Sequence, residues 1–294
     1  MIGPIGRSWN SGSSAIEQRL KNTRTARRID PGRRLKLPFE TLDLQTSDGV
    51  RLSAWFVPGS EERPRSDGLT AVLHHHYGGE KATLLSWIAL FHRLGIPSIS
   101  FDARGHAGSD PSPEGRGSFV KRSEDVRAAC DEALRRGARR ILAFGQSQGA
   151  AALLISAASR SDLAGCIVES GPAPDMSTAA WGLSGNMLGR VGRRSLLTRT
   201  LLSARIIPGT EPVSYLVRLW GSLARLRGTP LLWIHGGRDS VIRRGWSSLW
   251  FRALEPPGHL WRSVFVPEAD HVRCLQEGGA LVEAEVADFI DRLA

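Results

Sequence analysis

From residue 70 onward, the sequence alternates short apolar, β-branched runs with longer segments that have the apolar spacing of amphipathic helices. This alternation is typical of crossover units, in which parallel strands form one buried sheet. The expected strands are 70–73, 96–101, 140–144, 163–169, 230–235 and 261–266, and the expected helices are 81–94, 118–136, 148–158, 241–254 and 279–293. The pattern predicts an α/β fold with a mostly parallel sheet and helices on both faces.

Two further strands are expected before this region, over residues 40–45 and 50–57. The dipeptide Asp48-Gly49 between them is a hairpin signal, because both residue types tolerate a positive φ. The hairpin would add an antiparallel edge and bring the predicted sheet to eight strands.

The chain of 294 residues is 41% hydrophobic and has the length of one large α/β domain. It contains no apolar run long enough to span a bilayer and no apolar leader at its start, so we expect a cytoplasmic protein. Its three cysteines are too few for a disulfide framework.

The formal net charge of +10 is concentrated in two segments. Residues 1–36 carry nine basic and two acidic side chains, and residues 172–228 carry eight arginines and two acidic side chains. We expect 1–36 to be a mobile basic tail with a short helix near 14–20, and 37–294 to be one domain. The arginines predict a solvated surface or an attraction for an anionic group. Nucleic acid is not expected as a partner, since no recognition motif accompanies the charge.

The run Gly145-Gln146-Ser147-Gln148-Gly149 lies between an expected strand and an expected helix. This is the context of a nucleophile elbow, in which a serine at a strained turn raises its hydroxyl above the strand ends. Small residues on both sides let the turn close, and the N–H of Gln148 would face an oxyanion at the helix N-terminus. The alternative is an ordinary tight turn whose serine caps the helix.

With these motifs the chain resembles the serine hydrolases of the α/β-hydrolase superfamily, in particular esterases and the serine-aminopeptidase-like or dienelactone-hydrolase-like groups. The resemblance rests on five ordered motifs around the elbow, namely Asp48 to Trp55, His75 to Gly79, Asp102 to Ser109, His235 to Asp239 and Asp270-His271. It covers about residues 40–294 and implies the α/β-hydrolase fold.

The resemblance implies a catalytic triad of Ser147 as nucleophile, Asp239 as acid and His271 as base. Glu169 or Asp175 is the alternative acid, because some relatives carry the acid after the strand that corresponds to 163–169. The oxyanion donors would be the backbone N–H groups of Gln148 and Tyr77. His76 stands where relatives have the first glycine, which puts the Tyr77 donor in question.

Three consecutive histidines, 74–76, also allow a metal-site hypothesis, since alternate strand residues share a face. No third ligand with zinc spacing lies nearby, so neither a metal nor a cofactor is expected. We expect His75 to hold the oxyanion loop instead.

Residues 172–228 are expected to form a helical cap inserted in the domain. Ten large apolar side chains from Leu183 to Ile207 (Leu, Ile, Val and Met) predict short helices with an apolar underside over Ser147. Trp181 and Trp220 would either line the substrate pocket or hold the cap to the core.

The predicted function is hydrolysis of a carboxylic ester, as in carboxylesterases, through an acyl-enzyme on a small-molecule acyl substrate. A thioesterase or an acyltransferase would use the same three residues. The alternative from another class is a binding protein that has the fold without catalysis.

Overall fold

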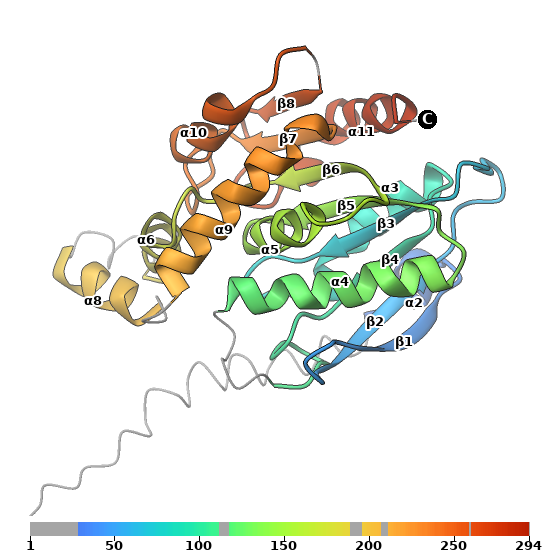
Figure 1. Ribbon diagram of the computed structural model, residues 1–294, viewed down its shortest axis with the longest axis horizontal. Coiled ribbons are helices and arrows are strands. Elements are labelled where there is room, and N and C mark those ends of the chain that lie inside the picture. The colour runs from blue at the N-terminus through green and yellow to red at the C-terminus, as the bar shows by residue number, and fades with distance from the viewer. Residues whose placement is uncertain (1–28, 112–117, 189–195, 207–210, 259, 294) are drawn as a thin grey trace, which may run out of the picture.

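The computed structural model describes residues 29–111, 118–188, 196–206, 211–258 and 260–293. Its centre is one sheet of eight strands in the order β1-β2-β4-β3-β5-β6-β7-β8 (Figure 1). The strands are β1 (Glu40–Gln45), β2 (Arg51–Val57), β3 (Leu69–His74), β4 (Ser98–Phe101), β5 (Arg140–Gln146), β6 (Leu163–Glu169), β7 (Leu231–Gly236) and β8 (Trp261–Val266). The predicted α/β-hydrolase fold is confirmed.

The two kinds of strand pairing follow the sequence prediction. β1 and β2 form the antiparallel hairpin, and β2 pairs antiparallel with β4. All later neighbours pair in parallel. β3 is buried along its whole length and β5 at every residue after Arg140, which explains why both are nearly continuous apolar runs and not alternating ones. Because parallel strands share one carboxyl edge, the loops that follow them lie together.

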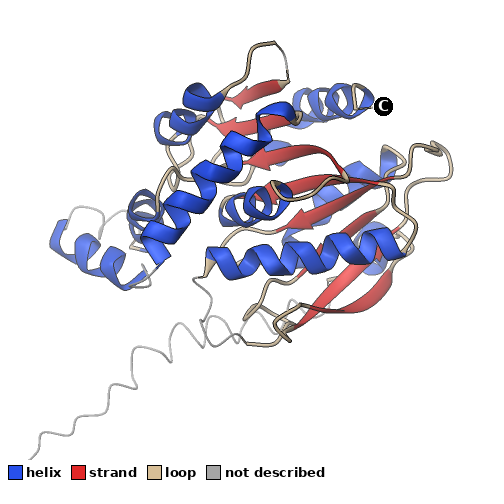
Figure 2. Ribbon diagram, viewed as in Figure 1, coloured by secondary structure: helices blue, strands red, loops and turns tan. Residues whose placement is uncertain are grey.

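Helices cover both faces of the sheet (Figure 2). The first face carries α4 (Phe119–Arg135), α5 (Gln148–Ala157), α9 (Glu211–Arg225) and α10 (Arg244–Leu254). The other face carries α3 (Leu85–Arg93), preceded by the 3-10 turn η2 (Lys81–Leu84), and α11 (Cys274–Asp291). The remaining elements are α2 (Pro31–Leu35), α6 (Met176–Met187), α8 (Leu196–Ile206) and the 3-10 turn η4 (Leu226–Gly228).

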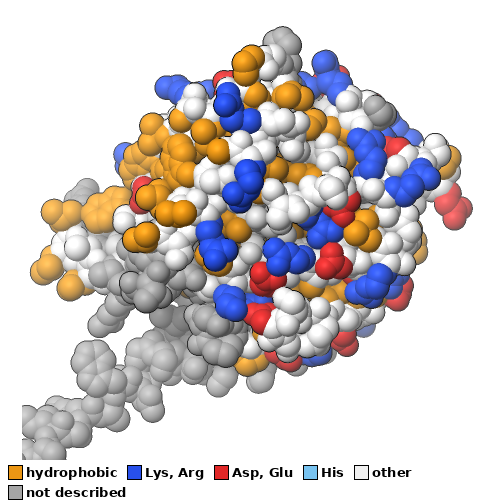
Figure 3. Space-filling model, in the orientation of Figure 1, with side chains coloured by type: hydrophobic (Ala, Val, Ile, Leu, Met, Phe, Trp, Pro, Cys, Tyr) orange, Lys and Arg blue, Asp and Glu red, His pale blue; other side chains and the backbone are white. Residues whose placement is uncertain are grey.

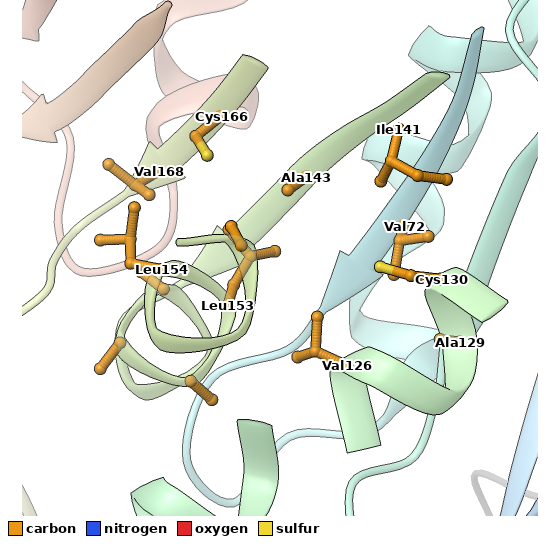
Figure 4. Close-up of a cluster of buried hydrophobic side chains, with 14 of the residues drawn as sticks. Val72, Val126, Ala129, Cys130, Ile141, Ala143, Leu153, Leu154, Cys166 and Val168 are labelled. Atoms are coloured by element: carbon orange, nitrogen blue, oxygen red, sulfur yellow. The ribbon is translucent and has the colours of Figure 1, made fainter. Parts of the chain in front are cut away.

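The core between the sheet and the first helical face is built from small and aliphatic side chains (Figure 4). Cys130 on α4 and Cys166 on β6 belong to it, and Cys274 is buried on the opposite face. Burial raises the pKa of Cys130 and of Cys166 to about 12, since a thiolate there would lose its solvation. These thiols therefore pack as small apolar groups.

Part of the segment predicted as a basic tail is helical in the structure. Residues 31–35 form α2, because Pro31 starts the helix and the Asp30 side chain accepts a hydrogen bond from the Arg33 N–H. Leu35 then packs against the core. The helix expected near 14–20 lies outside the described residues.

The segment 172–228 divides into two parts where one cap was predicted. α9 packs on α5 and α4, and its side chains Tyr215, Leu219 and Leu223 are buried in the core. A crossover is needed between the parallel strands β6 and β7, and α9 is the helix that provides it.

α6 and α8 form the second part and pack against each other. Three of the aliphatic residues predicted on the underside of a cap, Leu196, Leu197 and Leu201, are instead 59–71% exposed on α8. Val213 and Val217 on α9 are exposed as well, and Figure 3 shows hydrophobic side chains gathered over this region. Trp220 is half-buried against the core and donates to the Pro174 carbonyl.

Candidate active site

The elbow between β5 and α5 has the strained geometry expected of its sequence. Ser147 adopts φ 52° and ψ −114°, a left-handed conformation that is rare for a residue with a side chain. A Cβ atom at Gly145 would lie 2.7 Å from the Cα of Ala150, and one at Gly149 would lie 2.5 Å from the His75 carbonyl oxygen. Glycine at both positions lets α5 start directly against the sheet edge.

The imidazole of His271 lies against the hydroxyl of Ser147. The distance from His271 Nε2 to Ser147 Oγ is 2.9 Å, although the two residues are far apart in the sequence. Ser147 follows β5 and His271 follows β8, so the shared carboxyl edge of the sheet brings them together. Ser147 is 7% exposed, which leaves its hydroxyl in a largely dry environment.

Asp239, from the loop after β7, completes this chain of hydrogen bonds. Its Oδ1 and Oδ2 atoms lie 3.0 and 2.9 Å from His271 Nδ1. Oδ1 also accepts from the N–H groups of Val241 and Ile242, at 2.9 and 2.7 Å, which fixes the carboxylate. Because a carboxylate only accepts, His271 Nδ1 carries the proton and the lone pair of Nε2 faces Ser147.

The two alternative acids lie elsewhere. Asp175 caps the start of α6 by accepting from the N–H and the hydroxyl of Thr178, both at 2.8 Å. Glu169 is fully buried below the elbow, where it accepts from Trp87 Nε1 at 3.0 Å, Gln146 Nε2 at 2.6 Å and the Cys274 N–H at 2.7 Å. Of the three candidate acids, Asp239 is the one that contacts His271.

Glu169 and its neighbour Ser170 connect the elbow with the histidine loop. The Glu169 backbone carbonyl accepts from the Ser147 N–H at 2.9 Å, while its side chain accepts from Cys274 just after the histidine. The Ser170 hydroxyl accepts from the Val272 N–H at 2.9 Å. Both Ser170 and Val272 have a φ of 54°, so this bond joins two strained residues. Sequence reasoning considered Glu169 only as an acid and missed this connecting role.

The loop after β3 is held by histidine side chains. His74 Nδ1 donates to the His75 carbonyl at 2.8 Å, and His75 Nδ1 donates to the His76 carbonyl at 2.7 Å. His75 Nε2 accepts from the Ala103 N–H at 3.0 Å, which agrees with a proton on Nδ1. His75 thus holds this loop in the structure, as the sequence suggested.

The peptide between His76 and Tyr77 is fixed by the same contacts. The His76 carbonyl also accepts from the Gly79 N–H at 3.1 Å, which closes a turn that needs the φ of 74° at Gly78. In a planar trans peptide the N–H points opposite to the carbonyl, so the Tyr77 N–H is directed away from His75. No hydrogen bond within the described ranges uses this N–H. Gln148, the first residue of α5, likewise has an N–H that its own helix cannot satisfy.

Buried imidazoles around the site predict a dependence of stability on pH. Burial lowers the pKa of His74 to about 3 and that of His235, which donates to the Ile242 carbonyl, to about 4, from an ordinary value of 6.5. Below about pH 6.5 the unfolded chain binds protons that the folded chain does not, so the free energy of unfolding falls as pH drops toward 4. At pH 5 we expect a loss of about 2 kcal/mol for each such imidazole relative to pH 8.

Urea unfolding at a series of pH values measures this effect. In His235→Asn the free energy of unfolding should fall less steeply between pH 6.5 and pH 4, because one fewer imidazole takes up a proton on unfolding. An unfolding free energy that stays constant between pH 8 and pH 5 would contradict the assignment of neutral buried imidazoles.

Within the described residues, no group of three or more His, Cys, Asp and Glu side chains could hold a metal ion. In the same residues no helix has the length and apolarity needed to cross a membrane. A parallel sheet whose carboxyl edge carries a hydroxyl, an imidazole and a carboxylate in contact has the architecture of an α/β hydrolase.

Comparison with known proteins agrees with this architecture. A model of the alpha/beta hydrolase family matches residues 71–285, most of the chain, and the protein belongs to this family. The uncharacterized protein YfhR of Escherichia coli K12 is 24% identical over 261 residues, which cover 85% of this chain and 80% of YfhR. The alpha/beta hydrolase domain-containing protein WAV2 of Arabidopsis thaliana is 33% identical over 122 residues, 40% of this chain and 37% of WAV2.

Solved structures with the same fold include esterases. The Pyrococcus furiosus esterase Pf2001 superposes with a TM-score of 0.71 and 18% identity, covering 89% of this chain and 93% of the esterase. The alpha/beta hydrolase GrgF from Penicillium sp. sh18 gives a TM-score of 0.63 at 18% identity, over 87% of this chain and 99% of GrgF. Together with the family match, these neighbours support assignment of the protein as a hydrolase.

Proposed function

We propose that the protein is a serine hydrolase that cleaves carboxylic esters through an acyl-enzyme on Ser147. The observation that supports this most strongly is the 2.9 Å contact between Ser147 Oγ and His271 Nε2, with His271 Nδ1 bonded to Asp239. A serine hydroxyl is a weak nucleophile at neutral pH, and an imidazole in this tautomer can accept its proton as it attacks.

The reaction has two halves. His271 Nε2 takes the Ser147 proton while Oγ bonds to the carbonyl carbon, and the N–H groups of Gln148 and Tyr77 donate hydrogen bonds to the developing oxyanion. His271 then gives its proton to the leaving alcohol as the ester C–O bond breaks, which leaves the acyl-enzyme. In the second half His271 deprotonates water, the hydroxide attacks the acyl carbon, and Ser147 regains its proton as the carboxylic acid departs. Asp239 stays ionised and stabilises the imidazolium.

We propose that α6 and α8 cap this site. The supporting observation is the close approach of α6 to the loop that carries Asp239, since a side-chain carbon at Gly182 would collide with the Val241 carbonyl. A cap restricts the substrate to a small acyl compound. The arginines of segment 172–228 would favour an anionic group on it.

A fluorophosphonate probe tests the nucleophile. We expect wild-type protein and Ser263→Ala, an exposed control on β8, to be labelled, and Ser147→Ala to remain unlabelled. On p-nitrophenyl esters, kcat of Ser147→Ala should fall by about 10⁴ or more. Folded wild type that neither reacts with the probe nor hydrolyses any ester would favour the binding-protein alternative.

The same assay separates related acyl chemistry. Faster turnover of a thioester than of its oxygen ester would favour a thioesterase. A product that depends on added alcohol or amine would favour an acyltransferase.

A further inference from the structure

A fully buried arginine lies on the side of the site that carries the oxyanion donors. Arg122 on α4 is 0% exposed, and its Nη1 donates to the side-chain Oε1 of Gln148 at 2.5 Å. Its Nη2 lies 3.2 Å from His106 Nε2, which is the acceptor nitrogen because His106 Nδ1 donates to the Arg104 carbonyl at 3.0 Å. The centre of the guanidinium is 6.0 Å from the ring of Tyr77. Arg122 therefore contacts both residues whose backbone N–H groups were assigned to the oxyanion.

The contact with Arg122 determines how the Gln148 amide is turned. A guanidinium has no acceptor, so the amide oxygen must face it and the amide nitrogen must point away. Gln148 is 5% exposed, comparable to Ser147 at 7%, and its Nε2 has no hydrogen-bond partner in the described structure. Gln148, the residue after the nucleophile, thus has a buried donor, Nε2, on an amide that the Arg122 guanidinium polarises through its oxygen.

Arg122 brings a positive charge to this part of the site. The nearby imidazoles of His74 and His75 are neutral, because burial and the Arg122 charge both lower their pKa. Asp125 on the same helix is an opposite charge near Arg122, and its carboxylate is bound by Arg104 Nε at 2.7 Å and by the Arg104 N–H at 2.9 Å. Arg104 in turn pairs with both oxygens of Asp48.

We propose that Arg122 is a positioning residue. Together with the Gln148 side chain, it places positive charge beside the oxyanion donors of Gln148 and Tyr77 and so stabilises the tetrahedral state. This inference rests on the proposed function. A neutral ester gains little from a buried charge, whereas the oxyanion appears only as Ser147 attacks. In a dry site such an interaction is strong, so removing the charge should lower kcat and leave KM nearly unchanged.

The test compares kcat and KM of wild type, Arg122→Lys, Arg122→Met and Arg127→Met on a neutral p-nitrophenyl ester. Arg127, partly exposed on the same helix and paired with Glu124, is the matched control. We expect Arg122→Met to lose about 30-fold in kcat with KM within about twofold, and Arg122→Lys to recover most of that loss. Arg127→Met should match wild type.

A second variant covers the case in which Arg122→Met does not fold. Gln148→Glu is nearly isosteric and places a carboxylate against the guanidinium, which cancels the charge without removing Arg122. Its kcat should fall by a similar factor. Phenylboronic acid, which adds to the serine as a tetrahedral anion, should lose affinity in parallel.

Several outcomes would overturn the inference. They are an unchanged kcat in Arg122→Met or Gln148→Glu, a loss confined to KM, a loss in Arg122→Lys equal to that in Arg122→Met, or unchanged boronate affinity. In each of these cases an active wild type and an inactive Ser147→Ala would leave the proposed function standing. An inactive wild type that the fluorophosphonate probe does not label would instead overturn both.

Discussion

Changing Asp239 to asparagine is expected to lower kcat for ester hydrolysis by about 10⁴ without unfolding the protein. The reason lies in the two backbone N–H groups of Val241 and Ile242 that donate to Oδ1. An asparagine keeps its oxygen there, so its NH₂ group takes the place of Oδ2, 2.9 Å from His271 Nδ1. The imidazole must then accept at Nδ1 and carry its proton on Nε2, where it cannot deprotonate Ser147.

Steady-state kinetics with a p-nitrophenyl ester measures this loss, and circular dichroism checks the fold. Asp131→Asn, an exposed change on α4, is the control and should keep wild-type kcat. His271→Ala should lose at least as much activity as Asp239→Asn. If Asp239→Asn retained more than a tenth of wild-type kcat, Asp239 would not set the tautomer of His271.

Gly149→Ala is expected to damage both stability and catalysis. Its Cβ would lie 2.5 Å from the His75 carbonyl oxygen and 2.6 Å from that of His74. These carbonyls belong to the end of β3 and the loop that follows it, which the sheet and the His74 side chain hold in place. We expect a loss of about 1–3 kcal/mol in unfolding free energy, as for other overpacked sites. A shift of the loop by about 1 Å would lower kcat about 100-fold.

Gly245→Ala is the matched control, because Gly245 also lies in the first turn of a helix and has nothing within 4 Å of an added Cβ. An alanine there should stabilise the helix by about 0.5–1 kcal/mol and leave kcat unchanged. Equal behaviour of the two variants in urea unfolding and ester turnover would contradict the close approach of α5 to the loop after β3.

The sequence predicted the fold because periodicity and turn chemistry are local properties. The alternation of strands and helices fixes a parallel sheet, and Asp48-Gly49 marks the hairpin. The motif order also anticipated that Ser147, Asp239 and His271 would lie within hydrogen-bonding distance. Their catalytic roles stay predictions until the variants are measured.

Features that depend on distant contacts were not predictable. Arg122 looks like any charged residue of an amphipathic helix, and only the packed structure shows that it is buried against Gln148. Glu169 was recognised as a polar strand end, but its donors come from three separate segments. The exposed leucines of α8 show the same limit, since apolar spacing cannot tell a face that packs from one that does not.

The burial of all three native cysteines makes the protein convenient for site-directed labelling. Maleimide reagents require an accessible thiolate. All three sulfurs are buried, and the pKa values of Cys130 and Cys166 are raised, so these thiols should not react. A single cysteine introduced as Leu197→Cys, at a position 71% exposed on α8, would therefore take up a fluorophore selectively in the otherwise native sequence. Fluorescence from that dye could follow movement of α8 during turnover.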